Sequence, residues 1–302
     1  WIGTDNGLCR YNREMNNFER IEFPDKNQQT FRHKVGALFE DQEGRIWIGS
    51  NNGAYLLYYP NKKFVPYLDS LIQGKEISEF ETDNNGNLII SFHDLGLLIN
   101  NIEKGTTELI NTNHLIYPLK ENNIYTIDVD AQNRIWIGYY SKGISMIDFK
   151  GKKIKHFEHE PNNNKSLSNN FISDLCVDKN NNVIIGTNGG GLSVFDNKTK
   201  TFSKYVLSEA VGSIISNSIN TLYYAPDGMI WIGGWGSGLS VYDKRLYKFT
   251  YYNHEDQNNG SLSGQSVTSF AEDFNSNIWI STDGGGIDCF DTRTQRFTNY
   301  NS

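Results

Sequence analysis

The sequence is poor in residues that cross-link or interrupt a chain, and it has no long apolar run. Its 302 residues include only six prolines, three methionines and three cysteines. Cys9, Cys176 and Cys289 lie far apart, so neither a disulfide framework nor a thiolate metal site is expected. No stretch approaches the roughly 18 apolar residues of a membrane helix. The net charge of −7 argues against a basic nucleic-acid-binding surface.

Glycine and aromatic residues are abundant instead. The chain has 28 glycines, 17 tyrosines and 17 phenylalanines. Its apolar residues form short stretches that alternate with polar ones, and clusters of Asn, Asp and Gly separate these stretches. Alternation with a period of two is typical of strands, so an all-β fold without helices is predicted.

One motif recurs along the whole chain. Its most complete copies read Gly-Arg-Ile-Trp-Ile-Gly at 44–49 and Asn-Arg-Ile-Trp-Ile-Gly at 133–138. The central position of the seven copies is occupied by Trp1, Trp47, Ile89, Trp136, Ile184, Trp231 and Trp279. A second position follows each by 17 or 18 residues, at Phe18, Phe64, Thr107, Ile154, Phe202, Phe249 and Phe297. Two positions in constant phase over seven copies indicate a repeat protein.

Each copy contains four short strands separated by turns, which is typical of a β-propeller blade. The sequence therefore predicts one seven-bladed β-propeller of four-stranded antiparallel blades over residues 1–302. The expected blades are residues 1–23, 31–68, 76–111, 122–158, 170–206, 217–253 and 265–302. We expect the repeated Trp and Phe to fill the space between blades. Asp41, Asp83, Asp130, Asp178 and Asp273 are expected to cap the first hairpins through Asx-type bonds.

The first blade lacks its first strand, because the motif begins at Trp1. We interpret the chain as a fragment. The missing strand would come from upstream residues or from elsewhere, and the sequence leaves this open.

The repeat, written D-x-x-G-x-I-W-I-G-T-x-x-G-L-x-x-Y-D, resembles the two-component-regulator propeller repeat. The Ser-Leu-Ser segments at 166–168 and 261–263 match its inter-blade segments. The resemblance covers nearly the whole chain and departs from the pattern at the third copy (Ile89, Phe92, His93) and at the fifth (Ile184).

This resemblance implies the periplasmic sensor region of a Bacteroides-type hybrid two-component system, in an inner-membrane protein with a histidine kinase and response regulator. The ligand would be an oligosaccharide from a complex glycan. Neighbouring receptor domains and a second copy of the receptor are the implied protein partners. The membrane would be reached only through segments outside this fragment. No catalytic residue, metal, cofactor or nucleic acid is expected here.

The repeat also suggests where a ligand could bind. After the second strand, four copies have a hydroxyl residue followed by Asp or Asn, which suits a tight turn. The other three have Phe92-His93, Tyr139-Tyr140 and Gly234-Trp235. Aromatic faces on a loop can stack against a sugar, and nearby polar groups can bind its hydroxyls. The candidate ligand contacts are therefore Trp235, Tyr139, Tyr140, His93, Asp94, Asn188 and Asp283.

Other interpretations remain open at this stage. An aromatic residue at a blade edge often fills the groove between blades, or contacts a partner domain. The protein could instead be a propeller enzyme of the lyase or glycosidase type, or an interaction scaffold without a ligand. His159 and His254 precede the two Ser-Leu-Ser segments by the same interval, so we interpret them as linker structure.

Overall fold

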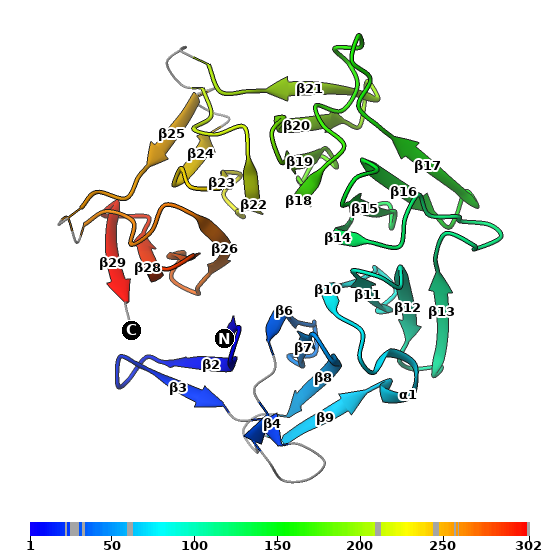
Figure 1. Cartoon of the computed structure of the whole chain (residues 1–302), viewed down its shortest axis with the longest axis horizontal. Coiled ribbons are helices and arrows are strands. Elements are labelled where there is room, and N and C mark those ends of the chain that lie inside the picture. Colours follow the sequence, from blue (N-terminus) through cyan, green and yellow to red (C-terminus); the bar gives the residue numbers. More distant parts are fainter. Residues whose placement is uncertain are drawn as a thin grey trace. The chain divides into compact units, whose positions relative to one another are not determined.

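Short antiparallel strands make up almost all of the regular structure (Figure 1). The computed structural model describes residues 1–21, 23–24, 30–31, 34–58, 63–208, 213–243, 248–256, 258 and 260–300. Two compact units are present. The N-terminal unit contains Trp1–Ile137 and Met146–Lys155, and the C-terminal unit contains Gly138–Ser145 and His156–Ser302.

The strands form one sheet for each copy of the repeat. The first blade has β1 (Ile2–Thr4), β2 (Gly7–Asn12) and β3 (Asn17–Ile21). The second has β6 (Val35–Glu40), β7 (Ile46–Ser50), β8 (Gly53–Tyr58) and β9 (Lys63–Tyr67). The third has β10 (Ile77–Thr82), β11 (Leu88–Phe92), β12 (Leu97–Asn101) and β13 (Thr106–Ile110). The fourth has β14 (Ile124–Val129), β15 (Ile135–Tyr139), β16 (Ile144–Asp148) and β17 (Lys153–Phe157).

The later blades repeat this order. The fifth has β18 (Ile172–Val177), β19 (Val183–Thr187), β20 (Gly191–Asp196) and β21 (Thr201–Tyr205). The sixth has β22 (Ile219–Tyr224), β23 (Ile230–Gly234), β24 (Leu239–Asp243) and β25 (Lys248–Tyr252). The seventh has β26 (Val267–Glu272), β27 (Ile278–Thr282), β28 (Gly286–Asp291) and β29 (Arg296–Tyr300). The prediction of a seven-bladed propeller with a three-stranded first blade is confirmed.

The second strands of blades two to six carry the core. All five residues of β7, β11, β15, β19 and β23 are buried. A strand in the middle of a sheet that is covered on both faces must be apolar along its whole length, which explains the continuous Ile-Trp-Ile. The fourth strands are more exposed, as β13 and β17 show.

Aromatic residues of the repeat pack between consecutive blades, as predicted. In the N-terminal unit, the ring of Trp47 lies 6.5 Å from that of Phe80 in the next blade. In the C-terminal unit, the ring of Trp231 meets that of Phe290 edge-on, with the centroids 5.4 Å apart. Both pairs lie within hydrophobic clusters that join strands of neighbouring blades. One blade cannot bury both of its faces, so the repeats stabilise one another by stacking.

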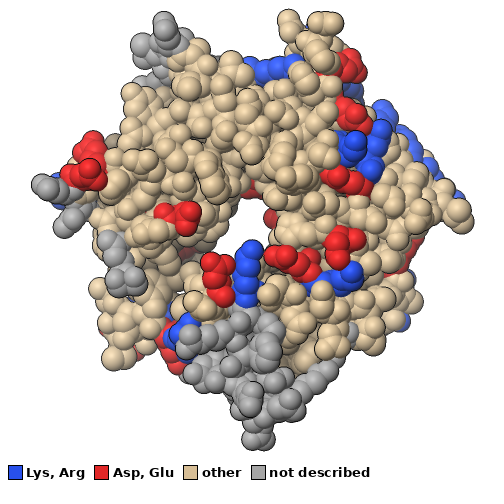
Figure 2. Space-filling view, in the orientation of Figure 1, with Lys and Arg blue, Asp and Glu red and all other residues tan. Residues whose placement is uncertain are grey.

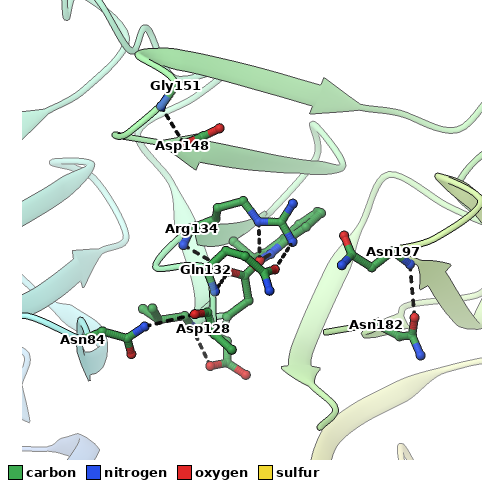
Figure 3. Close-up of polar contacts among 12 residues, drawn as sticks. Asn84, Asp128, Gln132, Arg134, Asp148, Gly151, Asn182 and Asn197 are labelled. Atoms are coloured by element: carbon green, nitrogen blue, oxygen red, sulfur yellow. Dashed lines mark hydrogen bonds and ion pairs between the residues drawn. The ribbon is translucent and has the colours of Figure 1, made fainter. Parts of the chain in front are cut away.

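The predicted Asx caps are present at the first turns. Asp130 Oδ1 accepts hydrogen bonds from the backbone N–H groups of Gln132 and Arg134, at 2.9 and 3.1 Å. The same pair of bonds occurs at the other four turns, with Asp41, Asp83, Asp178 and Asp273. Figure 3 shows Arg134 folded back over its turn and bonded to the side chain of Gln132.

The second carboxylate oxygen of these residues binds the repeated tryptophan. Trp47 Nε1 donates to Asp41, Trp136 Nε1 to Asp130 and Trp279 Nε1 to Asp273, at 2.8, 2.9 and 3.2 Å. Where Ile184 replaces the Trp, the side-chain amide of Asn182 donates to Asp178 instead. The tryptophan thus fixes the turn as well as filling the core.

The turns between third and fourth strands are capped in the same way. Asp148 Oδ1 accepts from the N–H of Gly151 at 2.8 Å (Figure 3). This bond, opposed by a smaller effect of burial, lowers the pKa of the Asp148 carboxyl. Asn182 accepts from the backbone N–H of Asn197, which joins the two turns of the fifth blade. Side-chain caps therefore lock one end of each blade.

The prediction of a chain without helices is wrong at one place. A short helix, α1 (Asp69–Ile72), lies in the connection between β9 and β10. Leu68 adopts a positive φ of 51° and its carbonyl accepts from the N–H groups of Leu71 and Ile72. The turn buries Ile72 completely in the cluster between blades two and three. A further pair of strands, β4 (Phe23–Pro24) and β5 (Thr30–Phe31), lies between blades one and two.

Candidate functional site

The opposite end of each blade carries the candidate residues. It is formed by the loop between the second and third strands, together with the residues that precede the first strand of the same blade and of the next. The N–H of Trp235 donates to the carbonyl of Ser218 at 3.0 Å, and the N–H of Asn188 donates to that of Phe171. Equivalent bonds start from Asn51, His93 and Asp283. The loop is thereby held against the residue that precedes each first strand.

The two loop positions that the repeat singled out differ in exposure. The first is buried in six of the blades, at Ser50, Phe92, Tyr139, Thr187, Gly234 and Thr282. The second is exposed at Asp5, Asn51, Tyr140, Asn188, Trp235 and Asp283, and half-buried at His93. Only the second position can meet a ligand in solution.

The three divergent blades also close this loop differently. Where the first position is Thr or Ser, its hydroxyl donates to the carbonyl of the glycine that begins the third strand, as Thr187 does to Gly191 at 2.8 Å. Phe92, Tyr139 and Gly234 have no hydroxyl at that place. In these blades a backbone N–H makes the bond, at 3.0, 3.0 and 2.8 Å to Gly96, Gly143 and Gly238. The hydroxyl-to-carbonyl bond of this loop is therefore absent in the three divergent blades.

Trp235 is the most exposed of the aromatic candidates. Its side chain is 61% exposed. The loop beneath it is well connected, because Gly236 N–H donates to Ser266 Oγ at 2.9 Å and Ser237 Oγ donates to the Trp235 carbonyl. A large indole face is thus presented to solvent from an ordered loop.

Tyr140 belongs to the same C-terminal unit and is 42% exposed. Its ring meets that of Phe171 edge-on, with the centroids 4.4 Å apart. Asn188 and Asp283 are exposed at the equivalent place in the fifth and seventh blades. The side chain of Asn169 donates to the Asn188 carbonyl. The C-terminal unit thus presents aromatic and polar residues alternately at one end of successive blades.

Tyr139 does not fit the predicted role. It is the last residue of β15 and its side chain is fully buried. The expectation that it lies exposed on the loop is wrong, because the buried second strand extends one residue further than the motif suggested. This position follows the alternative interpretation, in which an aromatic residue fills the interior of the blade.

His93 and Asp94 lie in the N-terminal unit. The half-buried His93 ring packs edge-on against Tyr125, with the centroids 5.2 Å apart. Asp94 forms a 2.8 Å ion pair with Lys75. An exposed pair of this kind contributes little to stability. The ion pair occupies the Asp94 carboxylate, so a ligand would have to compete with Lys75 for it.

The sequence missed the second half of this surface. Phe171, Ser218 and Ser266 immediately precede the first strands of their blades and contact the loops described above. In blades two, three and four, the residue before the first strand is Lys34, Glu76 and Asn123. Comparing this position across the repeats would have singled out Phe171, because it is the aromatic residue there.

The two repeated histidines are structural, as predicted. His159 Nδ1 lies 2.8 Å from the Leu167 carbonyl, and His254 Nδ1 lies 2.7 Å from that of Leu262. In both linkers the following glutamate N–H donates to the first Ser of the Ser-Leu-Ser segment. Two copies with the same bonds indicate a linker motif.

Charge does not dominate the surface drawn in Figure 2. Among the residues described there, acidic and basic side chains are interspersed and most atoms belong to other residues. Within the described part of the chain, no group of three or more His, Cys, Asp or Glu residues is placed to hold a metal ion. No described helix is long and apolar enough to cross a membrane.

Five segments match the sequence profile of the two component regulator propeller, at residues 32–52, 118–141, 166–189, 213–236 and 261–284. The chain carries two component regulator propeller repeats. Each matched segment ends at or within the loop that follows a second strand, so the repeat includes the candidate positions.

A curated relative of these repeats is histidine kinase P4 of Formosa agariphila. It is 26% identical over 187 aligned residues, which make up 56% of this chain and 13% of the relative. The chain thus spans about an eighth of that relative's length. The extracellular domain of a putative hybrid two component system from B. thetaiotaomicron is 22% identical, with a TM-score of 0.43. That match covers 98% of this chain and 47% of the other.

Propellers of other function share the fold. The structure of a catalytically inactive virginiamycin B lyase from Staphylococcus aureus with quinupristin has a TM-score of 0.68 and 14% identity. It covers 92% of this chain and 87% of the lyase. At this level of identity the likeness shows a common fold only.

Proposed function

We propose that this propeller is the ligand-sensing part of an extracytoplasmic two-component receptor and that it binds an oligosaccharide. The ligand would lie on the loops of the C-terminal unit, against Trp235 and Tyr140. The observation that carries the proposal is the exposure of these two rings at a position where four other blades have Asp or Asn.

The chemistry of this surface suits a sugar. The C–H face of a pyranose is apolar and stacks on an aromatic ring, while its hydroxyls require hydrogen-bonding partners. Asn188 supplies an amide and Asp283 a carboxylate, both exposed at the equivalent loop position. The backbone bonds that hold Trp235 and Asn188 in place reduce the ordering that binding requires.

Signalling would follow from differential binding. A ligand shifts a receptor only if it binds one arrangement more tightly than another. The blades are closely packed and capped, so the change would lie between this propeller and neighbouring receptor domains, or between two receptor copies. We infer a periplasmic position for the propeller, before a membrane segment and a kinase. The histidine kinase relative and the repeat matches support a role in two-component signalling.

Calorimetric titration with a panel of oligosaccharides tests the proposal. Trp235→Ala is expected to weaken binding at least about tenfold, which corresponds to roughly 1.4 kcal/mol. The matched control is Phe274→Ala, because Phe274 is 99% exposed but lies in a capped turn at the opposite end of its blade. It should leave the Kd unchanged.

Two outcomes would contradict the proposal. Equal loss of affinity in both variants would show that binding does not depend on the loop end of the blades. Conversion of an oligosaccharide into products during the titration, detected by chromatography, would favour a propeller enzyme over a sensor.

A further inference from the structure

The connection between the third and fourth blades contains a turn built around His114, in the N-terminal unit. Residues 114–117 form this turn, which we call the His114 turn. The ring atom Nδ1 of His114 accepts a hydrogen bond from the backbone N–H of Tyr117 at 3.0 Å. On the other side of the ring, Nε2 lies 3.2 Å from Glu108 Oε1 in β13. The imidazole therefore joins the tip of the connection to the outer strand of the third blade.

These two contacts define where the ring carries its proton. A backbone N–H group can only donate, so Nδ1 of His114 must present its lone pair. The proton is then on Nε2, which faces the Glu108 carboxylate. A neutral imidazole has one donor and one acceptor and satisfies both contacts. An imidazolium has two donors, so its Nδ1–H would face the Tyr117 N–H and this hydrogen bond would be lost.

Ring packing limits how the histidine could escape this conflict. The His114 side chain is 16% exposed and stacks on the Tyr117 ring, with the centroids 5.5 Å apart and the planes 12° from parallel. Tyr117 in turn meets Phe149, which follows β16, edge-on at a centroid distance of 5.0 Å. A protonated ring could regain its hydrogen bonds only by turning out of this stack, and the turn would open with it.

Titratable groups around the ring come from β13, β16 and β17 as well as from the turn. Glu108 would attract a protonated His114, but its side chain is 52% exposed, and solvent screens exposed pairs. Burial raises the pKa of Tyr117, and the Glu108 and Asp148 carboxylates raise it further, so its phenol stays neutral. A backbone hydrogen bond lowers the pKa of Asp148, which also pairs with Lys153 at 3.3 Å. Of these side chains, an imidazole is the one that changes its charge between pH 5 and pH 8.

The His114 turn also holds other parts of the connection. Leu115 and Ile116, between the two bonded residues, are 98% and 55% exposed. Further along the connection, the Asn122 side chain accepts from the Thr112 N–H at 2.9 Å, and the Asn122 carbonyl accepts from the Gly96 N–H at 3.1 Å. Gly96 closes the loop of the third blade that contains candidate ligand contacts. A change in the turn can therefore reach that loop through the connection.

We propose that the His114 turn is an acid-sensitive element. At neutral pH the unprotonated ring holds the turn closed and fixes the exposed Leu115 and Ile116 in one position. Protonation of His114 removes the acceptor of the Tyr117 N–H, so the turn opens in mild acid and loosens the connection to the loop of the third blade. This element would act whether or not the propeller is a sensor.

Hydrogen exchange of the intact chain, measured by NMR between pH 8 and pH 5, provides the test. The protection factor of the Tyr117 amide should fall by up to about tenfold per pH unit below about 6.5, where a free imidazole titrates, since the closed turn accepts only the neutral ring. The Glu160 amide is the internal control, because His159 Nδ1 faces a carbonyl and so accepts protonation without losing a hydrogen bond. The protection factor of Glu160 should stay constant.

Two variants separate the histidine from its surroundings. His114→Asn keeps an acceptor for the Tyr117 N–H, its side-chain carbonyl, but cannot gain a proton, so the protection of Tyr117 should become independent of pH. Glu108→Gln keeps an acceptor for the Nε2–H but removes the charge that attracts an imidazolium. The acid loss of protection in Glu108→Gln should be at least as large as in the native chain. If protonation of Glu108 opened the turn instead, this variant would show no acid loss.

Three further results would overturn the inference. The first is pH-independent protection of Tyr117 while the His114 ring titrates. The second is an equal acid loss of protection in His114→Asn, which would assign the effect to another group. The third is an NMR spectrum at neutral pH that places the His114 proton on Nδ1.

Discussion

The bond between the turn aspartate and the repeated tryptophan predicts a large and specific loss of stability in Asp130→Ala. The Asp130 side chain is buried and accepts four hydrogen bonds, from the N–H of Gln132, from the N–H and Nε of Arg134, and from Trp136 Nε1. Alanine leaves a fully buried indole N–H without its acceptor, at a cost of about 1–3 kcal/mol. It also removes the carboxylate that pairs with the mostly buried Arg134 guanidinium, which brings the total to about 3–5 kcal/mol.

The fifth blade provides the comparison. Asp178 caps an equivalent turn, but Ile184 stands in place of the tryptophan and the Asn182 side chain donates to the carboxylate. Asp178→Ala should therefore lower the free energy of unfolding by only about 1–2 kcal/mol. Urea denaturation followed by circular dichroism gives both values.

A double-mutant cycle isolates the indole bond. In a Trp136→Phe background the indole donor is absent. The loss in free energy of unfolding caused by Asp130→Ala should therefore be smaller by about 1 kcal/mol or more. Strict additivity of the two substitutions, or equal losses in Asp130→Ala and Asp178→Ala, would refute the reasoning.

Three further predictions concern the scaffold. Burial would raise the pKa values of Asp41 and Asp273, but hydrogen bonds from the tryptophan and neighbouring groups outweigh it, so both lie below the usual 3.8. The stability that these carboxylates provide is fully present above pH 3.8 and is lost as the pH falls through the lowered pKa. In an Asn variant of either residue, the free energy of unfolding measured against pH should therefore fall less in acid. Ser166→Ala removes the acceptor of a linker N–H and should cost about 1 kcal/mol in chemical denaturation. Gly191 has a φ of 72° and a Cβ there would collide with the Tyr205 carbonyl, so Gly191→Ala should lower the Tm by several times the effect of Gly105→Ala, whose Cβ would meet no atom within 4 Å.

Most of this fold could be predicted from the sequence, because each strand and turn can be compared among the copies of the repeat. The Asx caps, the inter-blade aromatics and the two histidine linkers all recur, and the structure shows each of them. The indole bond to the turn aspartate was not predicted. It depends on side chains six residues apart that meet only once the hairpin has formed.

The features that sequence reasoning missed depend on packing between segments that the repeat motif does not describe. The helix α1 turns the chain between β9 and β10 so that the Ile72 side chain is buried, and the repeat motif does not describe this connection. Tyr139 is buried because β15 extends through this position, as β7 extends through Ser50 and β19 through Thr187. Phe171 reaches Tyr140 from the connection into the next blade, and only the three-dimensional structure brings these segments together.

The most direct test of the proposed function is a crystal structure of this chain with an oligosaccharide selected by calorimetry. The account predicts a sugar ring stacked on the Trp235 indole, with its hydroxyls within hydrogen-bonding distance of neighbouring loop side chains in the C-terminal unit. A sugar bound at the capped ends of the blades, with the Trp235 face empty, would contradict it.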